Sequence, residues 1–361
     1  MSVSRRLPAL LELRPGTVLP GKWCGHTYRI VRFVGRGANG AVYQALRDRS
    51  VVAIKIGDNA AAVALEYGRM RELTTSLGAS GIIPELYEQD DVEHGGELYP
   101  ALVMEFVRGV SPEAFIDLRG RAWIPLCLTK LLRLLEALHA KGYAFCDLKS
   151  ANLLFDPDTG EPRLIDFGGL TPIGQAVREF TELYDRAWWG RGTRKADCRY
   201  DLFACAMLGL QLMAPIDQAD MERLRTRRPV ERDAFLNRCI LSDGSSWRLR
   251  AANNREGNAT AAIFRDGQRQ LQAVLSKALK DQYRDPAEFR MALAVLLVHD
   301  REETRGTMKH TGETAKTAVG DGVGLRPRGR RRAWDATDWG LLVAVTIFAA
   351  TMGALLWLGS L

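Results

Sequence analysis

The segment "YAFCDLKSANLLF", residues 143–155, is the most informative motif in this chain. It contains Asp147, a lysine two residues later and an asparagine five residues later, all between aliphatic flanks. Asp147 can orient an attacking hydroxyl group, Lys149 can neutralise charge on a transferred phosphoryl group, and Asn152 can hold a metal ion through its amide oxygen. Because Asp-x-x-x-x-Asn occurs in many loops, the interpretation depends on the segments around it.

A glycine-rich segment, "GRGANGAV" at residues 35–42, lies upstream between two predicted strands. Glycines allow the backbone of a hairpin to lie close to phosphate groups, toward which its N–H groups can point. A strand follows the segment, and not a helix, which argues against a dinucleotide-binding fold. We expect a phosphate-covering loop with nucleotide contacts from Gly35, Arg36, Gly37, Ala38, Asn39, Gly40 and Val42.

The segment "VVAIKI", residues 51–56, places Lys55 within an apolar strand. A lysine in this position needs an anionic partner, which the phosphates of ATP and a helix glutamate would supply. The alternative is a lysine whose stem covers the edge of the strand while its ammonium group reaches water. Glu66 is the preferred glutamate because apolar residues follow it at helical spacing, and Glu72 is the alternative.

The segment "RLIDFGG", residues 163–169, is an apolar strand that ends at Asp166 and continues into a glycine turn. A carboxylate in this position is a suitable ligand for Mg²⁺. Each of the four segments is ambiguous alone, but their order along the chain is informative.

Together the four segments resemble those of eukaryotic-type protein kinases, of the kind found in bacterial membrane-anchored serine/threonine kinases. The resemblance covers residues 24–298, about three-quarters of the chain. It implies an α+β fold of two lobes, a small strand-rich lobe over residues 24–107 and a larger helical lobe over residues 108–298. It also implies that ATP and Mg²⁺, or Mn²⁺ in its place, are the cofactors. It assigns catalysis to Asp147, Lys149, Lys55 and Glu66, and metal binding to Asn152 and Asp166.

The segment "LVMEFVRG", residues 102–109, resembles the hinge between the two kinase lobes. In that role Met104 is the gatekeeper, and the main chain from Glu105 to Val107 is offered to adenine. The contacts that the resemblance implies with the adenine ring are Ala53, Met104, Glu105, Val107 and Leu154.

The two residues before Asp147 depart from the kinase pattern, because the usual His-Arg is here Phe145-Cys146. Phenylalanine can replace the bulk of the histidine. The arginine normally pairs with a phosphate on the activation segment, which a cysteine cannot do. We therefore hypothesise that loop phosphorylation does not switch this protein on. Cys146 is expected to be a buried filler; the alternative is a redox role, which the neighbouring carboxylate disfavours.

The segment "TELYDRAWWGRG", residues 181–192, stands where the family has Ala-Pro-Glu. Thr181 keeps the usual three-residue spacing to the next tyrosine. Arg284 resembles the arginine of the closing helices, which normally pairs with the missing glutamate. We expect it to lack a partner unless Glu179 or Glu182 replaces that glutamate.

Three further positions have expected roles. Asp201 resembles the helix aspartate that anchors the backbone of the catalytic loop. His139 is expected to be a surface or packing residue at a helix end. The run "RLRTRR", residues 223–228, is expected to be a solvated helix face, with docking of an acidic substrate as the alternative.

The C-terminal stretch "WGLLVAVTIFAATMGALLWL", residues 339–358, has no charged residue. Twenty such residues are enough to cross about 30 Å of hydrocarbon as one helix, and tryptophans near both ends are typical of membrane interfaces. A buried core helix would show a polar stripe, which this segment lacks. The run "RPRGRRR", residues 326–332, predicts a cytoplasmic bulk, an outside tail and contact with anionic lipids. The remaining expected segments are a lead-in at 1–23, a flexible basic linker at 299–338 and a tail at 359–361.

The formal net charge of +7 and the pI of about 9.2 favour anionic partners. The six cysteines form no C-x-x-C pair, which favours reduced thiols over a zinc or disulfide framework. The expected partners are protein substrates with serine or threonine hydroxyls and membrane lipids, and nucleic acid is not expected. Small residues in the span also permit a homodimer. The alternatives to an active kinase are a pseudokinase that binds nucleotide without turnover and a small-molecule phosphotransferase.

Overall fold

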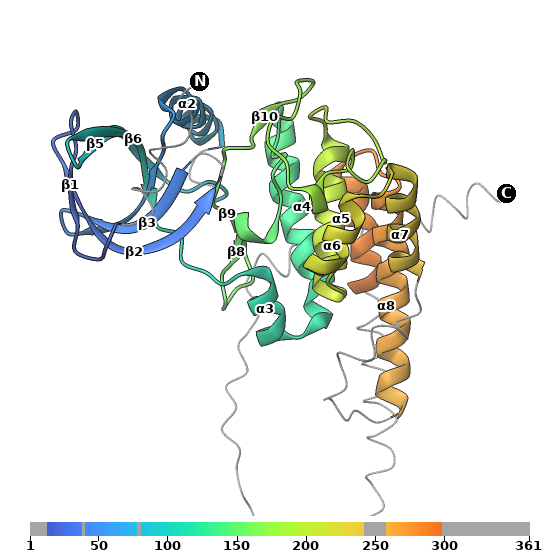
Figure 1. Cartoon of the computed structure of the whole chain (residues 1–361). Helices are drawn as coiled ribbons and strands as arrows, with labels where there is room; N and C mark the ends of the chain where they lie inside the picture. Colours follow the sequence, from blue (N-terminus) through green and yellow to red (C-terminus); the bar gives the residue numbers. More distant parts are fainter. Residues whose placement is uncertain (1–12, 38–39, 78–80, 242–257, 298–361) are drawn as a thin grey trace, which may run out of the picture. The chain divides into compact units, whose positions relative to one another are not determined.

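The N-terminal lobe is built on one antiparallel sheet of six strands in the order β1-β2-β3-β4-β6-β5 (Figure 1). This computed structural model describes residues 13–37, 40–77, 81–241 and 258–297. The strands are β1 (Val18–Pro20), β2 (Thr27–Gly37), β3 (Gly40–Arg47), β4 (Ser50–Ile56), β5 (Leu86–His94) and β6 (Glu97–Glu105). The three strands predicted around the glycine loop are confirmed as β2, β3 and β4.

The period of two along β4 separates the core of this lobe from the site. Val52 and Ile54 are fully buried in a cluster on one face of the sheet. Ala53 lies on the opposite face, against helix α2 (Ala60–Leu77), and Lys55 follows it there. The alternation of the strand therefore directs Lys55 toward α2 and away from water.

The lobe begins earlier in the chain than the sequence predicted. Residues 1–23 were expected to be a lead-in, but β1 pairs with β2, and Leu19 is fully buried in the core of the sheet. Leu13 is buried in the same cluster. A three-residue strand is too short to show an alternating pattern, which explains why the sequence does not reveal it.

The C-terminal lobe consists of helices around the apolar helix α5 (Cys198–Met213), which contacts both α4 (Ile124–Ala140) and α8 (Asn258–Leu279) (Figure 1). Gly209 in α5 permits close helix packing, since a Cβ atom there would lie 2.8 Å from Leu128. The helix α4 ends where the sequence predicts, with Lys141 as its cap and Gly142 at a φ of 82°. The other helices are α3 (Pro112–Arg119), α6 (Gln218–Arg225), α7 (Pro229–Leu241) and a last one over 286–297.

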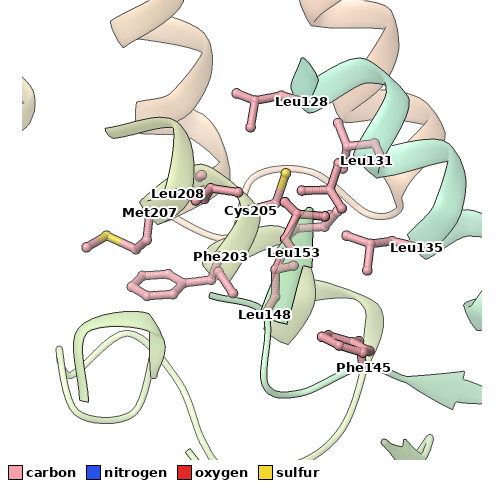
Figure 2. Packing of buried hydrophobic residues seen from close by; sticks show 14 of the residues in the cluster. Leu128, Leu131, Leu135, Phe145, Leu148, Leu153, Phe203, Cys205, Met207 and Leu208 are labelled. Carbon is pink, nitrogen blue, oxygen red and sulfur yellow. The ribbon is translucent and has the colours of Figure 1, made fainter. Parts of the chain in front are cut away.

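The core of this lobe directly supports the loop that carries Asp147. Figure 2 shows leucines of α4 and apolar residues of α5 packed against side chains that flank the loop. Phe145, Leu148 and Leu153 come from the loop and are each at most 1% exposed. The residues drawn with labels are Leu128, Leu131, Leu135, Phe145, Leu148, Leu153, Phe203, Cys205, Met207 and Leu208.

Four short strands bracket the loop. Antiparallel pairs form between β7 (Tyr143–Ala144) and β10 (Thr171–Pro172), and between β8 (Leu153–Phe155) and β9 (Pro162–Leu164). Asp166 follows β9 by two residues, so the hairpin places it beside the catalytic loop. Together with the N-terminal sheet, these elements confirm the predicted α+β fold of two lobes.

The predicted membrane span at 339–358, its linker at 299–338 and the tail lie outside the described residues. Within the ranges that the structure describes, no helix is long and apolar enough to cross a membrane.

Candidate active site

A buried ion cluster joins the two lobes at Lys55. Its Nζ atom lies 2.9 and 2.8 Å from the two carboxylate oxygens of Glu66 and 2.8 Å from Oδ1 of Asp166. The Lys55 and Glu66 side chains are 3% and 2% exposed. Burial disfavours the charge on Lys55, but the carboxylates of Asp166 and Glu66 outweigh it and raise the pKa of the ammonium group. The cluster therefore keeps Lys55 charged at a position where phosphate groups would meet it.

Glu66, and not Glu72, forms the ion pair with Lys55. The Glu72 carboxylate instead accepts a hydrogen bond of 2.5 Å from the hydroxyl of Tyr143 in β7. Six residues correspond to about one and two-thirds helical turns, so the two glutamates leave α2 in different directions. Arg69 lies between them in sequence and donates to the carbonyl of Leu170. Helix α2 is thus attached to the sheet on one side and to the C-terminal lobe on the other.

Asp147 lies at the centre of a hydrogen-bonded group of loop residues. Its carboxylate accepts from Lys149 Nζ at 2.8 and 3.0 Å and from Asn152 Nδ2 at 2.7 Å. Asn152 also donates to the main-chain oxygen of Asp147 at 2.9 Å. The Thr181 hydroxyl lies 3.5 Å from Asp147 and 3.4 Å from Lys149. The structure therefore brings together the loop residues that the sequence assigned to catalysis, with Thr181 beside them.

Asp201 of α5 fixes the backbone of the catalytic loop, as the sequence predicted. Its fully buried carboxylate accepts from the main-chain N–H groups of Phe145 at 2.7 Å and Cys146 at 2.8 Å. Cys146 adopts a φ of 62°, in the left-handed region, which costs a residue with a side chain about 1–2 kcal/mol. The bonds to Asp201 offset this cost and hold the turn immediately before Asp147.

His139 has a different role from the one expected. It was predicted to be a surface or packing residue, but its Nε2 atom lies 2.8 Å from Asp201, and its side chain is only 5% exposed. Burial disfavours the imidazolium, but Asp201 and Cys198 outweigh it and raise the pKa of His139 to about 9. His139 therefore supplies positive charge to the buried Asp201 carboxylate. The two residues are 62 positions apart, so the sequence pattern did not indicate the pairing.

The aromatic and glycine residues around Asp147 set its surroundings. Phe145 is fully buried and packs edge-to-face on Phe167, with ring centroids 5.6 Å apart. A Cβ atom at Gly169 would lie 2.5 Å from that of Asp147, so this position requires glycine. The sequence analysis did not predict this contact, although the second glycine of "DFGG" could have indicated it. Burial raises the pKa of the Cys146 thiol, which favours the buried filler over a redox residue.

The glycine loop approaches the ion cluster from the N-terminal lobe. A Cβ atom at Gly37 would lie 3.2 Å from the Asp166 carboxylate. Gly40 has a φ of 144°, and any side chain there would collide with the carbonyl of Ile56 on the neighbouring strand. Gly35, Arg36 and Val42 lie on the strands that lead into and out of the loop, whereas Ala38 and Asn39 lie outside the described residues.

The expected adenine contacts gather at the hinge. Ala53 and Met104 are direct cross-strand partners, and both are buried. The main chain of Val107 forms no hydrogen bond with any described residue, although the residue is only 9% exposed. The N–H of Glu105 donates to the carbonyl of Glu85, whereas the N–H of Val107 has no partner among the described residues. Leu154 is held beneath the hinge by two main-chain hydrogen bonds between Val110 and Phe155.

The residues assigned to a metal ion suit Mg²⁺ bound together with phosphates. The Asn152 side chain donates two hydrogen bonds through Nδ2, so its amide oxygen could serve as a ligand. The pKa of Asp166 is lowered because Lys55 outweighs the effect of burial, so its carboxylate is ionised. Among the described residues no group of three or more His, Cys, Asp or Glu side chains could hold a metal alone. Mg²⁺ is usually held in proteins by one or two carboxylates together with substrate phosphates.

The ion pairs that anchor the activation segment have their charges exchanged relative to the kinase pattern, because the cation is on the segment. Arg284 does not meet Glu179 or Glu182, because it lies 80% exposed beside Glu288. Instead, the cations are in the segment itself: Arg186 pairs with Asp197 at 2.7 Å and lies 3.8 Å from Asp281 of the C-terminal lobe. Arg191 pairs with Asp233 of α7 at 2.5 Å and also donates to Asn237 and to the carbonyl of Leu279.

The basic run at 223–228 is exposed, as expected of a solvated face, except for the buried Leu224. Arg225 in this run pairs with Glu182 at 2.8 Å, which explains why Glu182 does not meet Arg284.

A small antiparallel sheet and a helical lobe that meet at a lysine–carboxylate cluster and an aspartate–asparagine loop define a protein of the protein kinase class. Residues 28–213 match the protein kinase domain family, and the chain belongs to it. Serine/threonine-protein kinase YabT of Bacillus subtilis (strain 168) is 37% identical over 199 residues, which cover 55% of this chain and 59% of YabT. Serine/threonine-protein kinase PknA of Mycobacterium tuberculosis (strain ATCC 25618 / H37Rv) is 29% identical over 164 residues, which cover 43% of this chain and 37% of PknA.

The chain therefore spans less than two thirds of the length of these two relatives. Among solved structures, that of vaccinia related kinase 3 has 16% sequence identity and a TM-score of 0.54, and it covers 82% of this chain and 94% of the other. At this identity the likeness shows a shared fold.

The two glutamates of α2 allow a matched test of the ion cluster. Glu66→Gln removes a buried carboxylate from Lys55, and we expect kcat/KM for ATP to fall about tenfold or more. Glu72→Gln keeps an acceptor for Tyr143, and we expect a change of less than about threefold. Steady-state kinetics of both variants would measure the difference. A larger loss in Glu72→Gln would contradict the assignment.

The His139–Asp201 pair predicts a pH dependence of stability. Because the pKa of His139 is raised from 6.5 to about 9, its stabilisation is fully present below about pH 6.5 and is lost as the pH rises through 9. Relative to His139→Gln, which does not titrate, the wild type should lose on the order of 3 kcal/mol of unfolding free energy across this interval. Urea unfolding at a series of pH values would measure it. A constant difference between the two proteins would show that the pair does not titrate.

Proposed function

We propose that this protein is an ATP- and Mg²⁺-dependent serine/threonine protein kinase. The observation that carries the proposal is the simultaneous assembly of both halves of the site. Lys55 is paired with Glu66 and Asp166, while Asp147, Lys149 and Asn152 form one hydrogen-bonded group. A protein that had lost turnover would have no need to keep all of these charged groups ordered in one place. YabT and PknA, which are named as serine/threonine-protein kinases, support the same activity.

In this proposal each of these side chains has one role in phosphoryl transfer. Bound ATP with Mg²⁺ supplies the γ-phosphoryl group that is transferred. Asp147 accepts a hydrogen bond from the serine or threonine hydroxyl and orients its oxygen for in-line attack. Lys149, at 2.8 Å from Asp147, stabilises negative charge that develops on the transferred group. Lys55 would hold phosphate oxygens of the nucleotide, and Asn152 and Asp166 would hold the metal ion.

The acceptor side of the site favours a polypeptide over a small molecule. Thr181 lies next to both Asp147 and Lys149, so the activation segment forms one wall of the position where a hydroxyl would bind. The segment is fixed to the lobe by the buried Arg186, which lies 3.8 Å from Asp281, and by Arg191, which pairs with Asp233. A rigid shelf next to the catalytic aspartate suits an extended substrate chain.

We also propose that a C-terminal helix at 339–358 tethers the kinase to a membrane. The support is in the sequence: twenty residues without a charge, preceded by five arginines within 326–332. In this arrangement the kinase domain is cytoplasmic, and the arginines contact anionic lipid headgroups.

Phosphoryl transfer from γ-labelled ATP tests the kinase activity. We expect the full chain in mild detergent with Mg²⁺ to label a generic basic protein. We expect Asp147→Asn to lower the rate by about 10²–10⁴, since it removes the group that orients the hydroxyl. Asp158→Asn, an exposed aspartate in the next turn, is the control and should keep the wild-type rate. Tight ATP binding without any transfer would support the pseudokinase instead.

Membrane fractionation tests the tether. We expect the full chain to remain in the membrane pellet after washing with high salt and to be released by detergent. The double variant Ile347→Arg/Phe348→Arg should move to the soluble fraction, because each arginine at the centre of a span costs about 2.5–3.5 kcal/mol. Release of the wild type by salt alone would instead indicate a peripheral contact through the arginine run.

A further inference from the structure

The space beside Cys146 is filled by a small apolar cluster. Its members are Ala144 and Cys146 from the catalytic loop, Val177 from the activation segment, Ala196, and Tyr200 of α5. All five are at most 6% exposed. At the position of Cys146 the kinase pattern has an arginine that pairs with a loop phosphate. Here the activation segment packs on the catalytic loop through apolar contacts. The Arg186 guanidinium lies 5.5 Å from the ring centroid of Tyr200, and it is already paired with Asp197 at 2.7 Å.

The activation segment also pairs with itself. Gly174 donates to the carbonyl of Ala196 at 2.8 Å, and Ala196 returns a hydrogen bond to Gln175 at 2.8 Å. Val177 donates to the carbonyl of Arg194 at 2.9 Å, and Ala176 and Lys195 form an antiparallel bridge. The two ends of the segment are therefore joined by a short ladder, which closes the loop without a modification.

A buried carboxylate holds the middle of the segment. Asp185 is 0% exposed and accepts from Arg194 Nε at 2.7 Å and from the Tyr200 hydroxyl at 3.1 Å. The Arg194 guanidinium also lies 3.6 Å from the ring centroid of Phe180. Arg194 thus connects residues on both sides of Thr181, which contacts Asp147. A desolvated carboxylate needs such partners, so loss of Arg194 would leave a charge with one fewer donor in the interior.

The segment offers few hydroxyl groups for modification. From Phe167 to Asp197 the sequence has no serine, and its hydroxyl groups belong to Thr171, Thr181, Tyr184 and Thr193. Thr171 is buried and bonded to the carbonyl of Gly169, and Thr181 lies against Asp147. Of the four, Thr193 is exposed, and it lies on the C-terminal side of Thr181, the residue that contacts Asp147.

We propose that Asp185 and Arg194 are positioning residues that order the substrate shelf in place of a loop phosphate, together with the packing of Cys146, Val177 and Tyr200. The inference rests on the proposed kinase function, since it states how the acceptor side of that site is held. The kinase is then competent for transfer as soon as it folds.

Replacement of Arg194 tests the proposal on the full chain. Arg194→Met should raise KM for a protein acceptor about tenfold and leave KM for ATP within about twofold. Arg194→Lys keeps the cation and should recover part of the loss. Arg133→Met is the matched control, because Arg133 is an exposed arginine on α4, outside the segments that line the site. Equal kinetics of Arg194→Met and Arg133→Met would overturn the proposal.

Hydrogen exchange gives a readout that does not depend on turnover. In Arg194→Met the amides of Val177 and Ala196 should exchange at least about tenfold faster than in the wild type. If the wild type transfers no phosphate but this difference appears, the proposed function fails while the positioning role stands. If exchange is unchanged, the positioning role fails whatever the activity.

Dephosphorylation tests the independence from a phosphate. The wild type treated with a phosphatase, and the variant Thr193→Ala, should both keep the activity of the untreated protein. Loss of activity in Thr193→Ala that Thr193→Glu restores would show that a phosphate on the segment is required, and would overturn the proposal.

Discussion

The structure depends on charges that are taken out of water and paired there. The cluster of Lys55, Glu66 and Asp166 connects the N-terminal sheet, helix α2 and the segment that follows β9. Removing one partner from such a cluster leaves an uncompensated buried charge, which is costly, so the three elements must be in place together. A cluster of this kind selects one arrangement of the two lobes more strongly than apolar packing does, because apolar surfaces tolerate small shifts.

The same principle organises the C-terminal lobe. The buried Asp201 holds two amides of the catalytic loop and is paired with His139. Asp185 holds the activation segment through Arg194 and Tyr200. In both cases a carboxylate without access to water takes its partners from segments far apart in the chain. Asp201 keeps a contact of the kinase pattern, and the Asp185–Arg194 pair lies in a segment where this chain departs from that pattern.

Much of this could be predicted from the sequence where the signal is local. The strands around the glycine loop, the end of α4 at Lys141-Gly142, and the motif residues all depend on short-range patterns. The partner of Lys55 remained open between Glu66 and Glu72 because both lie on α2, and only the direction of each side chain separates them. The sequence did not reveal β1, the partner of His139 or the pairing of Arg284 with Glu288. The first two depend on contacts between distant segments that no spacing rule describes.

The missing Ala-Pro-Glu shows how such a prediction goes wrong. We expected only Glu179 or Glu182 to be able to pair with Arg284, because the family's ion pair has its glutamate on the activation segment and its arginine on the lobe. In this chain arginines of the segment meet aspartates of the lobe: Arg186 lies 3.8 Å from Asp281, and Arg191 pairs with Asp233. An ion pair with its charges exchanged has much the same energy, so the fold keeps the contact while the motif disappears.

The central claim is that this site is assembled for phosphoryl transfer without prior modification. A single-turnover measurement tests it directly, with enzyme whose freedom from phosphate has been established by mass spectrometry and γ-labelled ATP as the donor. We expect transfer to a protein that contains serine and threonine, and we expect this transfer to begin without a lag. No transfer, or a lag that follows the enzyme's own phosphorylation, would contradict it.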